Sequence, residues 1–313
     1  MGRNAELLRL ARIEANQEAA CTMSIVVTGA TGHLGRLTVQ ALLARGVDPA
    51  IITATGRNSE RLADVATLGV RTALADFDDV GSLKQAFEGA DKVLLVSGTD
   101  LGSRAAQHAN VIDVARTAGV GFIAYTSAPH ADTTALLLAV EHRATEELIE
   151  ASGLPHAFLR NGWYVENYTD QLTTTLEHGV VLGSAGDGRV SVAPRSDYAE
   201  AAAAVLATDG HDGQVYELGG DESVTLSDIA SAIAAAAGQP VTYQDVSAAA
   251  HLEVLLGAGL PAVVAEILVD ADRAIAAGEL EVTTGDLSRL IGHPTVPMAT
   301  AVADAVGARR SQR

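Results

Sequence analysis

The chain has 313 residues, of which 48% are hydrophobic, and it carries a formal net charge of -18. A chain of this length and composition can bury a large core, and its length alone suggests about two structural units. Its acidity argues against nucleic acid and anionic membranes as partners, because both need a basic surface. Its one cysteine, Cys21, cannot form an internal disulfide, and no apolar run reaches the length of a membrane span. We therefore expect a soluble, cytoplasmic globular protein without a membrane span.

Residues 1–22 precede the first predicted strand. They contain three arginines and three glutamates, and they lack the apolar core of an export signal. Two interpretations are open: a helical extension, or an upstream start with Met23 opening the functional domain. We favour the second and treat residues 1–22 as an extension outside the functional domain.

The first predicted strand, 24–27, leads into a glycine-rich turn, Thr28-Gly-Ala-Thr-Gly-His-Leu-Gly35, and a helix over 34–45. Such a turn leaves backbone N–H groups free at the start of the helix and points the positive end of the helix dipole at an anion. The first glycine permits the tight turn, the second lets the backbone approach a pyrophosphate, and the third allows close helix packing. The turn therefore predicts a dinucleotide site. We expect these residues to contact the cofactor: Gly29, Thr31, Gly32, His33, Leu34 and Gly35.

Strands and helices continue to alternate along the chain, which predicts right-handed crossovers and a Rossmann-type, doubly wound parallel sheet. In such a sheet the ligand lies beyond the carboxyl ends of the strands. The further strands are expected at 50–55, 70–75, 92–97, 121–126 and 156–159, and the helices between them at 59–68, 80–87, 104–117 and 134–151.

The alternation loosens from residue 161 onward. We expect an NAD(P)-binding Rossmann domain over 23–160 and a smaller α/β lobe over 161–313 that covers the substrate and is partly interleaved with the first. No long Pro/Ser-rich linker separates them, so the lobes should be in close contact. The predicted elements are a glycine-rich loop or hairpin at 179–194, a helix at 197–208, a strand at 214–218, and helices at 225–237, at 248–256 and from 261.

The end of the second predicted strand bears on which dinucleotide binds. An acidic residue there would favour the ribose of NAD, whereas an arginine favours the 2'-phosphate of NADP. The sequence has Arg57 and no acid, so we expect NADPH to be preferred over NADH, the alternative being that Arg57 is a solvated turn residue. Asp76 and Phe77 follow the third strand and are expected at the adenine, although Asp76 could instead cap the next turn.

The usual catalytic pair of reductases on this fold is missing. A tyrosine and a lysine four residues later normally protonate the new alkoxide. The chain has only Lys84 and Lys92, both before the fifth predicted strand, so the helix that follows that strand cannot carry the pair. His142 lies near the place of that lysine and is expected either to reach the cofactor or substrate, or to be a surface histidine. The substrate then needs no strong acid, or there is no chemistry.

Quinones fit the first option, because the hydroquinone anion formed by hydride addition is delocalised by its aromatic ring. Such a site needs a flat apolar slot and a hydrogen bond to the carbonyl oxygen. Aromatic residues make up 4% of the chain, yet its only tryptophan lies in the segment Arg160-Asn-Gly-Trp-Tyr-Val-Glu-Asn-Tyr168 after the sixth strand. We expect Asn161, Trp163 and Tyr164 to border a planar substrate on a loop. The alternative is that the aromatic rings seal the junction of the lobes.

Several motifs go beyond the general fold, and with them the chain resembles the atypical short-chain dehydrogenase/reductases related to the NmrA regulator, and within that group the bacterial type 2 NAD(P)H:quinone oxidoreductases. The resemblance covers about residues 23–297. It departs at Gly56, where the related enzymes look apolar, and in the N-terminal extension. The motifs are the glycine turn, Phe122-Ile-Ala-Tyr-Thr-Ser127, His130-Ala-Asp-Thr133, Glu141-His142, Leu159-Arg-Asn-Gly-Trp-Tyr164, Glu166-Asn-Tyr168, Gly186-Asp-Gly188 and Ile291-Gly-His-Pro294.

The resemblance implies reduction of quinones by NADPH without a flavin or a metal, with Ser97 and Ser127 along the cofactor. A second hypothesis is an NADP-binding redox sensor that regulates a partner without catalysis, and a third is reduction of another conjugated acceptor. The aromatic segment favours the quinone reductase. The sequence leaves open the physiological quinone and the oligomeric state, a homodimer being one option.

Overall fold

A seven-stranded parallel sheet forms the centre of the N-terminal part, with the strand order β10-β6-β5-β4-β1-β2-β3. The computed structural model describes residues 23–311, so the prediction for residues 1–22 lies outside the described residues. The order reverses between β1 and β4, as in a doubly wound fold, which confirms the predicted Rossmann-type sheet. Its strands are β1 (Ile25–Val27), β2 (Ile52–Gly56), β3 (Arg71–Leu74), β4 (Lys92–Leu95), β5 (Phe122–Ser127), β6 (His156–Asn161) and β10 (Gln214–Leu218).

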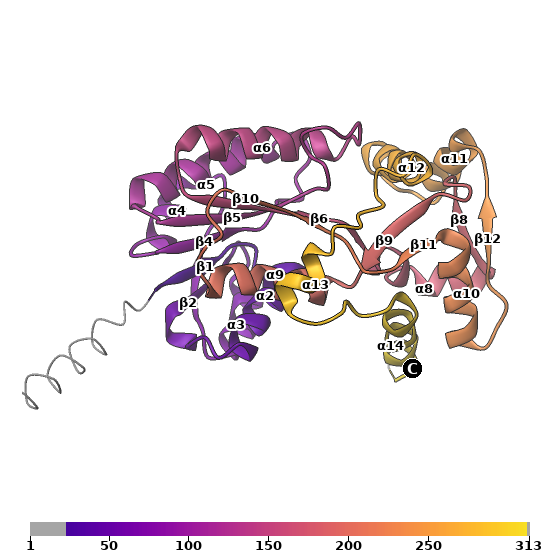
Figure 1. Cartoon of the computed structure of the whole chain (residues 1–313), viewed down its shortest axis with the longest axis horizontal. Coiled ribbons are helices and arrows are strands. Elements are labelled where there is room, and N and C mark those ends of the chain that lie inside the picture. Colours follow the sequence, from indigo (N-terminus) through magenta and orange to yellow (C-terminus); the bar gives the residue numbers. More distant parts are fainter. Residues whose placement is uncertain (1–22, 312–313) are drawn as a thin grey trace, which may run out of the picture.

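Helices cover both faces of this sheet (Figure 1). Strands β1 and β5 are buried along their whole length, as parallel strands covered on both faces are. One apolar cluster joins the sheet to α2 and α9, and another joins it to α4, α5 and α6. These helices are α2 (His33–Ala44), α3 (Ser59–Ala66), α4 (Val80–Ala86), α5 (Arg104–Ala118), α6 (Ala139–Ser152) and α9 (Arg195–Ala207), with a short 3-10 turn, η1 (Pro49–Ile51), before β2.

The helix expected over 134–151 begins later than predicted, at Ala139. His130 has a φ of 49°, and a turn follows it. The backbone N–H of Leu137 donates to the carboxylate of Asp270 at 2.6 Å. The segment before α6 therefore bonds to the C-terminal part of the chain instead of forming a helical turn.

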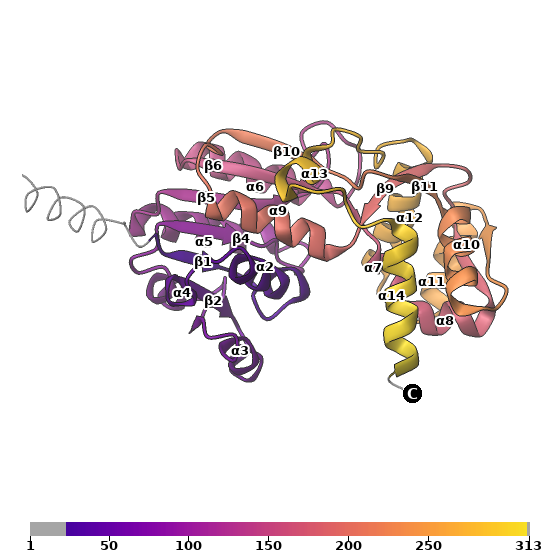
Figure 2. The ribbon, with the colours of Figure 1, turned by 60° about the horizontal axis from the view of Figure 1, so that its bottom comes forward.

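The C-terminal part has its own apolar core, built around two small sheets. Figure 2 shows this part beside the seven-stranded sheet, with the end of the described chain on its side. One sheet has the order β11-β9-β7, and the other pairs β12 with β8 in parallel. Its strands are β7 (Trp163–Tyr164), β8 (Val180–Gly183), β9 (Arg189–Ala193), β11 (Ser223–Thr225) and β12 (Thr242–Asp245). Its helices are α7 (Glu166–Thr169), α8 (Leu172–His178), α10 (Leu226–Ala237), α11 (Ala248–Gly257), α12 (Ala262–Ala276) and α14 (Met298–Ser311).

Two predictions for this part need comment. The segment 179–194 is neither a loop nor a hairpin, because β8 and β9 enter different sheets and find partners far away in sequence. The chain also returns to the N-terminal part: β10 pairs with β6, and α9 and α13 (Asp286–Ile291) pack in the same core as α2. The predicted domain boundary between residues 160 and 161 stays a prediction. Three elements after this boundary, α9, β10 and α13, pack with the N-terminal part. Within residues 23–311, no helix is long and apolar enough to span a membrane.

Candidate functional site

The glycine turn joins β1 to α2 and leaves the start of α2 open. Gly32 is the N-cap residue, no side chain caps the helix, and its first turn contains no acid. By contrast, Asn58 caps α3 and Asp79 caps α4 with side-chain oxygens. The N–H groups at the start of α2 can therefore bind an anion, with the helix dipole favouring negative charge.

The spacing of the glycines has a steric reason. Gly29 has a φ of 60°, in the left-handed region that glycine adopts without strain. A Cβ on Gly35 would lie 2.5 Å from the carbonyl oxygen of Gly29 and 2.9 Å from Cα of Ala30. No side chain fits there, so this glycine lets α2 pack directly on the turn.

A pocket of about 180 Å³ lies beyond the carboxyl ends of β1, β2, β3 and β4, where a doubly wound sheet binds its ligand. It brings together most of the residues that the sequence singled out for a cofactor. His33, Leu34, Gly35 and Ser127 are not in its lining. The lining residues are Gly29, Thr31, Gly32, Gly56, Arg57, Ala75, Asp76, Phe77, Val96, Ser97, Gly98, Thr99, Asp100 and Gln107.

Arg57 has an acidic partner in this pocket. Its NH1 lies 3.2 Å from Oδ2 of Asp100, which comes from the loop between β4 and α5. The same oxygen accepts from Nε2 of Gln107 at 3.4 Å. Arg57 is thus ion-paired rather than simply solvated, although 59% of its side chain stays exposed. Sequence reasoning missed Asp100 and Gln107, because neither stands in a recognisable motif.

Gly56, the departure from the related enzymes, has a local explanation. A Cβ at this position would lie 2.7 Å from Cγ2 and 2.8 Å from Oγ1 of Thr31. The glycine at the end of β2 therefore makes room for Thr31 of the glycine turn.

Asp76 closes a turn and also lines the pocket. Its Oδ1 accepts from the N–H of Asp78 at 3.0 Å, so it does close the next turn. It also lines the pocket beside Phe77, whose ring packs edge-on against His108 at a centroid distance of 6.0 Å.

Ser97 and Ser127 differ in their surroundings. Ser97 lines the pocket, and its Oγ accepts from the hydroxyl of Thr126 at 3.4 Å. Ser127 is buried and donates to Oε1 of Glu146 at 2.5 Å. Glu146 also binds Arg160 through both oxygens, at 3.0 and 2.7 Å. The hydroxyl proton of Ser127 is therefore engaged, and its lone pairs are what it can offer a ligand.

Arg160 bonds to both Glu146 and Glu217 near the carboxyl ends of β5, β6 and β10. Besides Glu146 it binds Glu217 at 2.9 Å, and the arginine side chain is 8% exposed. Burial opposes its charge, but the hydrogen bonds with Glu146 and Glu217 raise the pKa of Arg160 above its ordinary value. Arg160 therefore stays charged, as a buried and well-paired arginine.

His142 is buried between α6 and the sheet, so the alternative of a surface histidine is wrong. Its Nδ1 lies 2.8 Å from the hydroxyl of Tyr125. Burial, reinforced by the nearby charge of Arg104, lowers the pKa of His142 to about 3. The ring is therefore neutral near pH 7 and cannot act there as an imidazolium acid. It does not line the pocket of about 180 Å³.

The aromatic segment after β6 is strand β7 and helix α7, not the expected loop. Neighbouring side chains of a strand point to opposite faces. Accordingly Trp163 packs on the C-terminal core, whereas Tyr164 packs on the Rossmann core, with its ring 5.0 Å from that of Tyr198. The two rings thus lie in different cores and share no single wall.

Asn161 ends β6 next to these aromatics and is buried. Its Nδ2 donates to the hydroxyl of Tyr164 at 3.1 Å. Its Oδ1 is buried and has no hydrogen-bond partner among the described residues. A buried polar atom without a partner is costly, so this oxygen is suited to a donor on a ligand.

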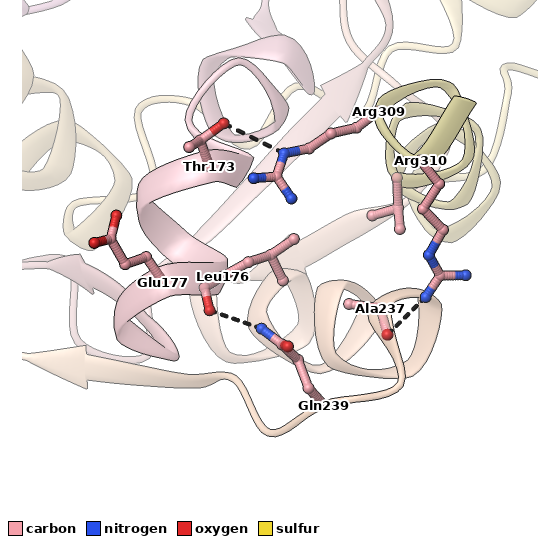
Figure 3. Close-up of a pocket in the computed structure, with 8 residues that line it drawn as sticks. Thr173, Leu176, Glu177, Ala237, Gln239, Arg309 and Arg310 are labelled. Carbon is pink, nitrogen blue, oxygen red and sulfur yellow. Dashed lines mark hydrogen bonds between the residues drawn. The ribbon is translucent and has the colours of Figure 1, made fainter. Parts of the chain in front are cut away.

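A second cavity, of about 400 Å³, lies between α8, α10 and α14 (Figure 3). Arg310 donates to the carbonyl of Ala237 at 2.7 Å, at the end of α10. Gln239 donates to the carbonyl of Leu176 at 2.7 Å, in the last turn of α8. Cationic and amide donors at helix C-termini stabilise the last carbonyls, so these two bonds join α8, α10 and α14 at the cavity. The described residues contain no group of three or more His, Cys, Asp or Glu side chains that could hold a metal ion.

Comparisons with known proteins agree with this geometry. A family described as NAD(P)H-binding matches residues 29–209. The chain is 45% identical over 278 residues to quinone oxidoreductase 2 of Escherichia coli (strain K12), covering 89% of this chain and 97% of that protein. It is 28% identical to the NAD(P)H azoreductase of Xenophilus azovorans, covering 79% and 84%.

Solved structures of NADPH-dependent reductases also match the chain. The chain matches an NADPH complex of the E. coli NADPH-dependent quinone oxidoreductase with a TM-score of 0.86 and 44% identity, over 90% of this chain and 99% of that chain. It matches the triphenylmethane reductase of Citrobacter sp. in complex with NADP(H) with a TM-score of 0.85 and 37% identity, over 90% and 100%.

Proposed function

Because the chain belongs to the NAD(P)H-binding family, and to the branch that contains quinone oxidoreductase 2, we propose that it reduces quinones with NADPH in the cytoplasm. The family resemblance seen in the sequence is thereby confirmed. The observation that supports a quinone as the electron acceptor is the 45% identity to quinone oxidoreductase 2 over 89% of this chain. The proposal includes direct hydride transfer, without a flavin or a metal.

The described residues fit the cofactor. The open start of α2 and the room left by Gly35 suit a pyrophosphate. Arg57 would bind the 2'-phosphate, with Asp76 and Phe77 at the adenine and Ser97 further along the cofactor. When bound, NADPH supplies a hydride from nicotinamide C4, which reduces the quinone to a hydroquinone monoanion.

The site provides hydrogen bonds rather than a strong acid. Tyr164 accepts from Asn161 and keeps its own O–H, which we assign to the quinone oxygen. Burial raises the pKa of Tyr164, so the phenol stays protonated near pH 7. Water then protonates the hydroquinone anion, which explains how the chain works without a tyrosine–lysine pair. We assign Trp163 to the side of the quinone that faces the C-terminal core, away from Tyr164, and we assign to His142 the positioning of the Tyr125 hydroxyl.

The lack of a tyrosine–lysine pair is also compatible with a second function, in which the protein binds NADP and regulates a partner without catalysis. An assay of NADPH oxidation by purified, flavin-free protein, with and without benzoquinone, separates the two functions. We expect quinone-dependent oxidation well above the uncatalysed rate. Nucleotide binding without such acceleration would exclude the reductase and favour the sensor.

A further inference from the structure

The carboxylate of Asp100 forms an ion pair with Arg57, the arginine that we assign to the 2'-phosphate. Arg57 follows β2, and Asp100 lies in the loop between β4 and α5, so the pair joins two separate elements across the pocket. Its distance is 3.2 Å, and the two side chains are 59% and 41% exposed. A ligand can therefore reach the pair and exchange with it.

Asp100 does not depend on Arg57 for its position. Its Oδ2 also accepts from Gln107, a buried side chain of α5, at 3.4 Å, and its carbonyl accepts from the hydroxyl of Ser103 at 3.2 Å. Gln107 is fixed in turn by donating to Asp78 at 2.9 Å. When a phosphate binds the guanidinium, the carboxylate therefore still has Gln107 as a partner beside the pocket.

The charges of the residues that line the pocket disfavour the binding of a 2'-phosphate. Among the described residues that line it, Arg57 is the one cation, while Asp76 and Asp100 are acids. A 2'-phosphate must displace Asp100 from the guanidinium and then remain close to its negative charge. A cofactor without this phosphate leaves the ion pair intact.

We propose that Asp100 tunes cofactor selectivity by competing with the 2'-phosphate for Arg57. The inference rests on the NADPH site proposed above and deepens it. The carboxylate lowers the affinity for NADPH more than that for NADH, so it narrows the preference that Arg57 creates. Asp100 is thus a specificity-determining residue, placed on a loop that the glycine motif does not include.

The test compares two probe nucleotides, 2',5'-ADP and 5'-AMP, which differ by the 2'-phosphate. Their dissociation constants are measured by calorimetry on the full chain, wild type and Asp100→Asn. Because an exposed ion pair is weak, we expect the variant to bind 2',5'-ADP roughly 3- to 5-fold more tightly, and 5'-AMP with less than about a twofold change. In an Arg57→Ala background, Asp100→Asn should leave the ratio of the two constants unchanged.

Asp78→Asn is the matched control, since it removes a carboxylate that binds Gln107 but does not pair with Arg57. It should change the ratio by less than about twofold. The inference is overturned if Asp100→Asn leaves the ratio unchanged, if it weakens 2',5'-ADP, or if Asp78→Asn has an equal effect. No quinone is present, so a failure to reduce quinones leaves this result standing. A wild-type chain that binds neither probe would overturn the cofactor assignment and this inference together.

Discussion

At the residue scale, the proposed function depends most on two side chains, Arg57 and Tyr164. The place of Arg57 in the pocket was predictable from its position after the second strand, because that position lines the ligand site in dinucleotide-binding folds. Its partner Asp100 was not, because the loop that carries it has no periodic pattern. Gly56 was only a departure in the sequence, and its contact with Thr31 supplies the reason.

Replacing Arg57 should separate the two cofactors. Arg57→Ala removes the guanidinium that can bind a phosphate through two hydrogen bonds, so the dissociation constant for NADPH should rise about 10-fold or more. That for NADH should change less than about threefold. Fluorescence titration of the bound nicotinamide measures both constants. Equal losses for the two cofactors would mean that Arg57 does not contact the 2'-phosphate.

Removing the hydroxyl of Tyr164 should affect the acceptor rather than the cofactor. Tyr164→Phe keeps the ring packed against Tyr198 but deletes the donor that we assign to the quinone oxygen. We expect kcat/KM for benzoquinone to fall roughly 10-fold or more, with NADPH affinity unchanged. Tyr216→Phe is the control, because its hydroxyl is paired with Nδ1 of His211 at 2.7 Å and neither residue lines the pocket. An unchanged kcat/KM in Tyr164→Phe would remove this residue from the site.

At the element scale, the alternation of strands and helices was enough to predict the parallel sheet, since parallel strands are apolar throughout and their helices amphipathic. The aromatic segment was harder. Its composition indicated a platform, but β7 sends Trp163 and Tyr164 into different cores. That outcome depends on the pairing of β7 with β9, which no local pattern reveals. The late start of α6 likewise depends on Asp270, far away in sequence.

The packing of α2 on the glycine turn gives a prediction at the element scale. In Gly35→Ala the new methyl would meet backbone atoms of Gly29 and Ala30, so α2 must move away from β1. We expect a loss of about 1–3 kcal/mol in the free energy of unfolding, and weaker binding of NADPH and NADH alike. Gly307→Ala in α14, where a Cβ meets nothing within 4 Å, is the control and should be neutral or slightly stabilising. Urea unfolding measures both, and equal stability of the two variants would contradict the packing argument.

At the scale of the whole molecule, the buried histidines couple stability to pH. Burial lowers the pKa of His108 and of His142 to about 3. Both rings stay neutral in the folded chain while the unfolded chain binds protons below about pH 6.5, so stability falls as pH decreases from 6.5 toward 3. At pH 5 the loss should be about 2 kcal/mol for each ring.

Urea unfolding at pH 7.5 and pH 5 measures this dependence. His142→Gln should reduce the difference in unfolding free energy between the two pH values. His178→Gln, at an exposed position, is the control and should keep it. A wild-type chain that is as stable at pH 5 as at pH 7.5 would contradict the neutral, buried state of these rings.

The most direct test of the proposed function follows the transferred hydrogen itself. Flavin-free protein is mixed with NADPH that carries deuterium at nicotinamide C4, and its quinone-dependent oxidation is timed against unlabelled NADPH. We predict loss of the label from the nicotinamide, a slower rate for the labelled position that is transferred, and no need for added flavin. Oxidation that appears only when flavin is supplied, or no oxidation above the quinone blank, would contradict direct hydride transfer by this chain.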